Sequence, residues 1–175
     1  GCQVRRFGRG ELVLQMGEPC QAFHIVVSGQ VKLYVLSTSG QEKVVDVIPP
    51  GGSFAEALMF LNRPSAVNAQ ALTDTLLVTV RRETVLEELR RDSSFALSML
   101  AGMSLRLHGL VQDVQASALQ SGVQRVIGYL LRDQEDDGVE GGVTVSLPVS
   151  KATVASLLSL TPEYFYRVLR ELESA

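Results

Sequence analysis

The chain has 175 residues, of which 46% are hydrophobic and 20% are charged, and its formal net charge is −3. This composition is that of an ordinary globular protein with one large or two small domains. The acidic balance gives no general indication of nucleic-acid binding, so any DNA contact must come from a local element. We find no apolar run of membrane-spanning length and no signal peptide, and we expect a cytoplasmic protein without a membrane partner.

Few residues in the chain are suited to metal binding or catalysis. Two cysteines, Cys2 and Cys20, are too few for a disulfide framework or a complete zinc site. The sequence also lacks a nucleophile elbow, a phosphate-binding Gly-Lys loop and paired metal ligands. We therefore expect that the protein is not an enzyme.

Residues 3–80 are rich in β-branched side chains and in turn signals. Strands are expected at residues 22–28, 31–37, 42–48, 67–72 and 75–80, and a helix at 55–61. Gly29-Gln30 is expected to join the first two strands as a tight hairpin, and the Pro-Pro-Gly-Gly run at 49–52 interrupts the pattern. Many short strands between closely spaced turns predict a β-sandwich or barrel.

A helical period replaces the strand pattern after residue 81. Residues 84–89 are expected to form a helix with Val85, Leu86 and Leu89 on one face. Residues 92–94, Asp-Ser-Ser, then predict the start of a long helix that continues to about residue 121.

Five apolar residues of the long helix recur at alternating spacings of three and four residues. They are Leu100, Met103, Leu107, Leu110 and Val114. This spacing is typical of a coiled-coil seam, and a seam this narrow indicates a symmetric contact between two copies of the chain. A single helix packed across its own barrel is the alternative explanation.

The segment after the long helix begins with a candidate hinge at Ser121-Gly122. An amphipathic helix is then predicted from Val123, Val126, Ile127, Leu130 and Leu131. Residues 134–142 are acidic and glycine-rich and predict a loop, and residues 143–147 alternate like a short strand.

Residues 149–173 carry the pattern of a helix-turn-helix. Ser150 is expected to cap a first helix that ends near Leu158, and Thr161 to cap a second helix with Pro162 at its first position. Ser159 occupies the turn, where glycine is frequent. An apolar wedge is expected between the helices, formed by Val154, Leu158, Leu160, Phe165 and Val168, with the small Ala155 where the backbones approach.

The second helix of this motif has two distinct faces. Phe165, Val168, Leu169 and Leu172 are expected to face inward, and Glu163, Tyr166, Arg167 and Arg170 outward. Such a helix places its N-terminal residues against base edges in the major groove.

Three residues of the second helix suit specific contacts with DNA. Glu163 suits cytosine N4, Arg167 suits guanine O6 and N7, and Thr161 suits a phosphate. Ser150 and Tyr164 complete the candidate DNA-binding set. The alternative is an ordinary exposed helix on which Glu163 and Arg167 form an i, i+4 ion pair.

Four stretches together resemble the CRP/FNR family of bacterial transcription regulators over nearly the whole chain. They are AFHIVVSGQVKLY, GGSFAEALMFLNRPSA, SLRLHGLVQDV and the terminal helix-turn-helix. The resemblance implies an α+β fold with a jelly-roll, cyclic-nucleotide-binding-like β-barrel at residues 1–92, a dimerisation helix at 93–121 and a winged helix-turn-helix at 122–175. It also implies a leading helix before this sequence and a wing after it.

The same resemblance implies partners and an effector pocket. The partners are a second copy of the chain, palindromic double-stranded DNA, a small-molecule or gas effector and RNA polymerase. The pocket residues so implied are Gly51, Phe54, Glu56, Ala57, Arg63, Ser65 and Ala66.

Two effector chemistries known in the family are disfavoured here. In relatives that bind cyclic AMP, an arginine and a serine hold the phosphate. Ser65 matches the serine, but Pro64 occupies the arginine position and Arg63 lies one residue early. Proline supplies neither charge nor donor, which disfavours cyclic AMP. Two cysteines cannot supply four thiolates, which disfavours an iron–sulfur cluster.

The stretch SFAEALMFL is most similar to the branch that responds to nitric oxide in denitrifying bacteria, a branch associated with haem. His24 and His108 are the candidate haem ligands. Glu163 and Arg167 match the Glu-x-x-Ser-Arg pattern that reads TTGAT half-sites, with Tyr166 in place of serine, so we expect a related palindrome. The effector stays open between haem-bound nitric oxide, a cyclic nucleotide and another small molecule. A ligand-binding module that regulates a protein partner is the competing class.

Overall fold

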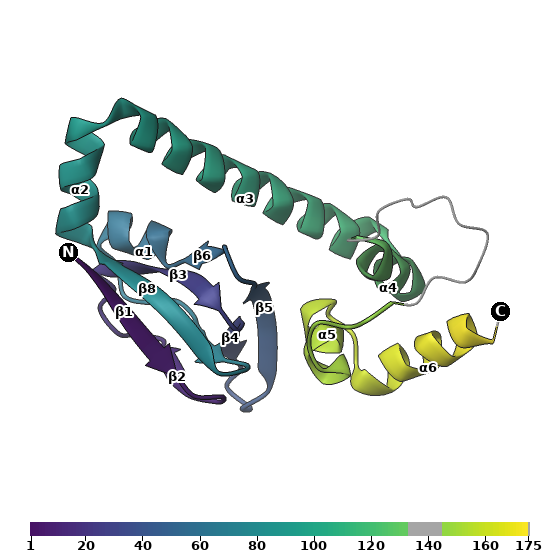
Figure 1. The fold of residues 1–175 in the computed structure, drawn as a ribbon. Helices are drawn as coiled ribbons and strands as arrows, with labels where there is room; N and C mark the ends of the chain where they lie inside the picture. Colours follow the sequence, from purple (N-terminus) through teal and green to yellow (C-terminus); the bar gives the residue numbers. More distant parts are fainter. Residues whose placement is uncertain (133–144, 175) are drawn as a thin grey trace. The chain divides into compact units, whose positions relative to one another are not determined.

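The computed structural model describes residues 1–132 and 145–174, which form two compact units, Gly1–Met103 and Ser104–Ala175 (Figure 1). The first unit contains two four-stranded antiparallel sheets, with strand orders β1-β8-β3-β6 and β2-β7-β4-β5. The strands are β1 Cys2–Phe7, β2 Leu12–Leu14, β3 Ala22–Ser28, β4 Val31–Leu36, β5 Glu42–Ile48, β6 Ser53–Phe54, β7 Asn68–Ala71 and β8 Thr75–Arg81. The two sheets form a sandwich that does not close into a barrel.

Apolar side chains from both sheets meet in one core. Its buried members are Phe7, Leu14, Cys20, Val26, Val31, Leu33, Ile48, Phe54, Ala69, Ala71 and Leu77. Side chains alternate along a strand, so Val26 of β3 belongs to this core while Phe23 packs on the other side of the sheet. There Phe23 meets Met59 of α1 (Glu56–Leu61) and Val85 of α2 (Arg82–Arg91).

The turn at Gly29-Gln30 corrects one expectation from the sequence. It is not a hairpin, because β3 pairs with β6 and β8 whereas β4 pairs with β5 and β7. The turn carries the chain from one sheet to the other. Gly29 has φ 82°, and a Cβ at this position would lie 2.5 Å from the carbonyl oxygen of Asp74. A glycine is therefore needed at this position because two backbone segments approach closely there, at the edge of the sandwich. Local turn signals in the sequence do not distinguish such a crossing turn from a hairpin.

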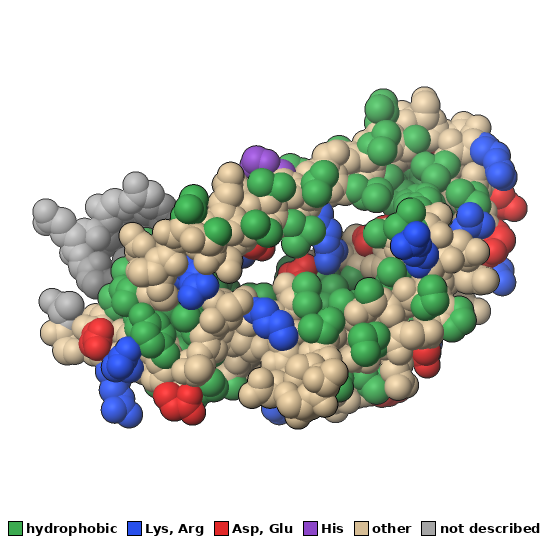
Figure 2. Space-filling view, turned by 180° about the vertical axis from the view of Figure 1, so that it is seen from behind, with side chains coloured by type: hydrophobic (Ala, Val, Ile, Leu, Met, Phe, Trp, Pro, Cys, Tyr) green, Lys and Arg blue, Asp and Glu red, His purple; other side chains and the backbone are tan. Residues whose placement is uncertain are grey.

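The long helix α3 (Ser93–Leu119) joins the two units, and none of its 27 residues is buried. Asp92 supports its start, since its side chain accepts a hydrogen bond from the Ser94 amide at 2.8 Å. By length and composition alone α3 could cross a membrane, so the expectation that no such segment exists is wrong on this criterion. Figure 2 shows hydrophobic side chains exposed along this helix.

The remaining described helices belong to the second unit. They are α4 (Gly122–Leu131), α5 (Lys151–Leu157) and α6 (Pro162–Glu173). Val126 of α4 is buried as expected, but Ile127 and Leu131 are exposed, so the buried face is narrower than the sequence predicts. Residues 145–147 form no strand, contrary to expectation. The predicted loop at 134–142 and the first residues of that strand lie outside the described residues.

Candidate functional site

Side-chain caps fix the starts of the two helices of the helix-turn-helix. The Ser150 hydroxyl accepts a hydrogen bond from the Thr153 amide at 3.1 Å, and the Thr161 hydroxyl accepts one from the Tyr164 amide at 3.2 Å. Pro162 occupies the first turn of α6, where its missing N–H leaves no donor unpaired. Both predicted caps are present, and they set where α6 begins.

A small apolar core holds α6 against α4 and α5. Its fully buried residues are Val126, Val154, Ala155, Phe165 and Val168. Leu158 and Leu160 are half-buried against it, which completes the predicted wedge. Leu172 is 38% exposed and does not belong to the inward face as predicted, because it lies near the end of α6, beyond the reach of this core.

The turn between α5 and α6 places a serine in the left-handed region, with Ser159 at φ 57°. This is the position at which the sequence departs from the usual glycine. The amide of Leu160 donates to the Ala155 carbonyl at 2.9 Å and closes the turn. The backbone therefore keeps the geometry of a helix-turn-helix despite the cost of a Cβ at this position.

Six of the seven predicted DNA-binding residues are exposed. They are Ser150, Thr161, Glu163, Tyr166, Arg167 and Arg170. The seventh, Tyr164, is half-buried and packs against the core of the unit. The structure thus separates Tyr164 from the solvent-facing set.

Arg167 has two neighbours on α6. Its guanidinium lies 4.8 Å from the centroid of the Tyr164 ring, and its Nε lies 4.0 Å from a carboxylate oxygen of Glu171. Among the described residues its ion-pair partner is Glu171, so the alternative pairing with Glu163 is wrong for this arrangement. Both partners are about two-thirds exposed, so the pair contributes little and leaves Arg167 available to a ligand.

Lys151 is a cation near this face that the sequence reasoning missed. Its Nζ lies 5.5 Å from the centroid of the Tyr166 ring, which joins the start of α5 to the outward face of α6. The sequence feature that could have indicated Lys151 is its position directly after the Ser150 cap, where a lysine is exposed. A cation there is well placed for a DNA phosphate.

The predicted effector residues differ in how far the structure buries them. Phe54 and Ser65 are buried, Glu56 is half-buried, and Gly51, Ala57, Arg63 and Ala66 are exposed. The Ser65 hydroxyl already donates to the Val67 carbonyl at 2.6 Å. The hydroxyl proton of Ser65 is therefore already used within the chain, and an effector at these residues stays a prediction.

The two candidate haem ligands have very different surroundings. His24 is buried, its ring stacks on Phe54 with centroids 5.0 Å apart, and its Nδ1 forms a 2.9 Å hydrogen bond with the Thr79 hydroxyl. Burial, with the nearby charge of Arg5, lowers the pKa of His24 from 6.5 to about 4. His108 is exposed on α3, with Nε2 3.2 Å from the Gln112 amide nitrogen.

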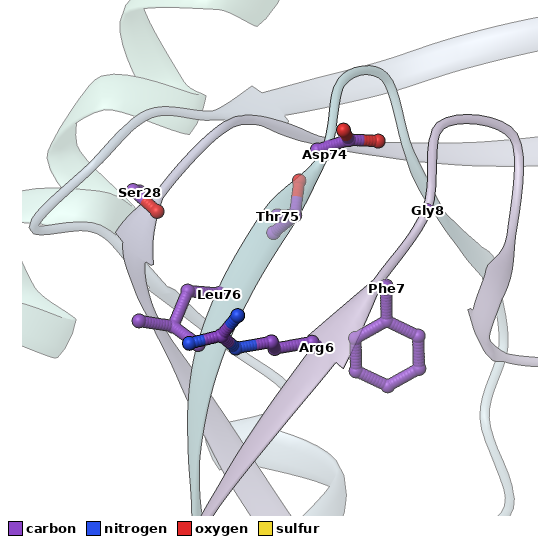
Figure 3. Close-up of a pocket in the computed structure, with 7 residues that line it drawn as sticks. All are labelled: Arg6, Phe7, Gly8, Ser28, Asp74, Thr75 and Leu76. Atoms are coloured by element: carbon purple, nitrogen blue, oxygen red, sulfur yellow. The ribbon is translucent and has the colours of Figure 1, made fainter.

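A shallow hollow of about 550 Å3 lies on the sandwich unit, and its lining residues include no member of the predicted effector set (Figure 3). Arg6, Phe7, Gly8, Ser28, Asp74, Thr75 and Leu76 line it. Figure 3 shows the Arg6 side chain extending beside Leu76, its partner on β8. Asp74 is already engaged, because its Oδ1 accepts a hydrogen bond from the Arg9 amide at 3.1 Å. The hollow offers one cation and little enclosure.

Two family models together match most of the chain. The cyclic nucleotide-binding domain matches residues 4–92, and the Crp-like helix-turn-helix domain matches residues 124–175. The global nitrogen regulator of Synechococcus elongatus is 25% identical over 177 residues, which cover 99% of this chain and 80% of the relative.

Solved structures show the same architecture. DNR from Pseudomonas aeruginosa is 34% identical with a TM-score of 0.53, over 98% of this chain and 75% of that one. FixK2 from Bradyrhizobium japonicum has a TM-score of 0.84 over 99% of this chain and 85% of that one, and at 22% identity it supports the fold alone. The relatives matched over nearly the whole of this chain, such as the global nitrogen regulator and the CRP-like regulator of Mycobacterium tuberculosis, are regulators and not enzymes, which agrees with the expectation from the sequence. The chain belongs to the CRP/FNR family of DNA-binding transcription regulators, with an effector-binding domain before its helix-turn-helix.

Proposed function

We propose that this regulator binds palindromic double-stranded DNA as a homodimer, with one α6 helix in the major groove of each half-site. The observation that carries the proposal is the outward face of α6, on which Glu163, Arg167 and Arg170 are all exposed. A capped start and a fully apolar inner face hold this helix in place. Exposed donors and acceptors on a rigid helix suit the readout of base edges.

The proposed dimer contact is the seam of α3. Its five residues are between 38% and 67% exposed in the single chain. Two such seams can pack knobs into holes and remove these apolar side chains from water. The apolar character that makes α3 resemble a membrane span is explained equally well by a helix that faces a second helix. The alternative is packing of α3 on its own sandwich.

The effector is proposed to bind the sandwich unit and to shift the two α3 helices against each other. That shift passes through Ser121-Gly122 and changes the orientation of the reading helices, because the effector prefers one of two arrangements. RNA polymerase is the proposed downstream partner, and the cytoplasm is the proposed location. In its most general form, the proposal requires only that the effector is a small molecule.

The haem and nitric oxide version is not supported by the residues present. For His24 to bind iron, its ring would have to leave its stack on Phe54 and its hydrogen bond with Thr79 inside the core. His108 is exposed on a helix that has no buried residue. In this arrangement neither histidine is therefore placed as a haem ligand.

The test is a selection of binding sites from random DNA, followed by binding measurements on single-base variants of the selected site. Arg167→Ala should relax the preference at one base pair by about 1–3 kcal/mol and leave the other positions unchanged. Arg90→Ala, which removes an exposed arginine from α2, is the matched control and should leave all preferences intact. If the wild-type chain selects no sequence, a module that regulates a protein partner becomes the better explanation.

A further inference from the structure

The first residue of α4 lies unusually close to a side chain of α6. A Cβ added at Gly122 would lie 2.6 Å from Cε1 of Tyr164 and 2.9 Å from both Cζ and the phenol oxygen. The other glycine of α4, Gly128, has open space around its Cα. Glycine is a poor helix former, so a close approach of this kind is a physical reason for its presence at residue 122.

The Tyr164 ring touches two functional segments at once. One edge lies against Gly122, which follows the Ser121 cap of α4 and lies three residues after the end of α3 at Leu119. The Arg167 guanidinium stacks over the ring, 4.8 Å from its centroid. The Tyr164 amide is bound to the Thr161 cap, so the backbone of this residue is fixed. The ring therefore occupies the space between the junction of α3 and α4 and the arginine that faces outward.

We propose that Tyr164 is a positioning residue that links the α3–α4 junction to Arg167. This inference rests on the proposed function, in which Arg167 reads a base pair. A free arginine side chain samples many rotamers, and stacking on a planar ring selects the few that lie over its face. A change at Ser121-Gly122 moves the wall against which the ring rests, and the ring changes the orientation of the guanidinium. Tyr164 acts here through Arg167, and not by touching DNA itself.

The geometry suggests a direct perturbation of this link. Gly122→Ala places a methyl group against the far end of the Tyr164 side chain, to which all three nearest atoms belong, so this side chain must shift to make room. Gly128→Ala adds the same methyl group to the same helix in open space and is the matched control. Tyr164→Phe keeps the ring and its stack, whereas Tyr164→Leu keeps apolar volume and removes the stack.

The experiment measures, in the full chain, the ratio of affinities for the selected DNA site and for the site changed at the Arg167-dependent base pair. We expect Gly122→Ala and Tyr164→Leu each to reduce this ratio on the order of tenfold, the scale of a weakened base contact. Gly128→Ala and Tyr164→Phe should leave the ratio unchanged. In the Tyr164→Leu background, the addition of Gly122→Ala should change nothing further, because the ring it displaces is gone.

Three results would overturn the inference, and each is distinct from failure of the proposed function. Equal ratios for Gly122→Ala and Gly128→Ala would show that the close approach has no effect on readout. An effect of Gly122→Ala that persists in the Tyr164→Leu background would place the coupling elsewhere. A fall in melting temperature without a fall in the ratio would make the contact structural only. If the wild-type chain discriminates no sequence at all, the proposed function fails and this inference fails with it.

Discussion

The sandwich and the helix-turn-helix bury different kinds of side chain. The buried polar or charged residues in the described part of the chain all lie in the sandwich unit. They are His24, Lys32, Ser65, Asn68, Thr75 and Thr79. The core of the helix-turn-helix has five fully buried members, and all five are apolar. The interior of the sandwich unit therefore contains groups that can change their protonation or hydrogen bonding, while the apolar core of the helix-turn-helix gives α6 a fixed support.

The long helix α3, which joins these two units, buries neither kind of side chain. It buries none of its own residues, although its seam is as apolar as either core. In water, a continuous apolar seam of this kind favours a partner surface, and we propose that a second copy of α3 supplies it. Variants at the seam of α3, in the core of the helix-turn-helix, at His24 and at the turn before α6 each test one part of this comparison.

The largest effect is expected at the seam of α3. Leu107→Asp combined with Leu110→Asp would place two carboxylates in an apolar contact, and we expect dimerisation to weaken at least on the order of a hundredfold. Analytical ultracentrifugation measures this change. Gln112→Asp, on the opposite side of the helix, is the control and should leave the dimer intact. A double variant that stays dimeric would show that the seam is not the interface.

The second-largest effect is expected in the apolar core of the helix-turn-helix. Phe165→Ala removes its largest fully buried side chain and should destabilise the unit by about 3–5 kcal/mol. Hydrogen exchange of the α6 amides measures the loss. Tyr166→Ala, at a side chain that is 43% exposed, should change stability by less than about 0.5 kcal/mol. Equal losses in the two variants would contradict the assignment of the inner face.

A pH effect is expected in the sandwich, at His24. The folded pKa of His24 is about 4, against an ordinary value of 6.5, so between these values the unfolded chain binds more protons than the folded one. The free energy of unfolding should therefore fall as the pH drops from 6.5 towards 4, by up to about 3 kcal/mol from this residue. Urea unfolding of the sandwich at several pH values measures the slope.

His24→Gln supplies the comparison, because its neutral side chain does not titrate in this range. The slope should become shallower in this variant, and an unchanged slope would mean that His24 already carries a proton in the folded protein.

The smallest effect is expected at the turn of the helix-turn-helix. Ser159 has φ 57°, and Ser159→Gly removes the steric cost of its Cβ, so we expect a gain of about 1 kcal/mol. Thermal unfolding measures the gain. Ala152→Gly, in the exposed part of α5, should instead lose about 1 kcal/mol. A loss in both variants would show that the serine makes a compensating contact.

Local and periodic features of this protein were predictable from its sequence. The caps at Ser150 and Thr161, the wedge around Phe165 and the extent of α3 all follow from neighbours within a few residues, and the structure confirms each of them. Such features depend on backbone hydrogen bonds and helical spacing, which the order of residues sets directly. The outward face of α6 was predictable for the same reason.

Contacts between distant segments were decided only by the tertiary structure. The sequence indicated a hairpin at Gly29-Gln30, but pairing with remote strands places β3 and β4 in different sheets. It could not show that Gly122 touches Tyr164, or that His24 is buried beside Thr79, since each pair is more than 40 residues apart. By itself the sequence determined the helices and the longer strands, through local hydrogen bonding and hydrophobic period, but not the short strands β2 and β6. Which of them pair, and which side chains they bury together, depended on packing across the whole fold, because burial is shared among segments that no local pattern connects.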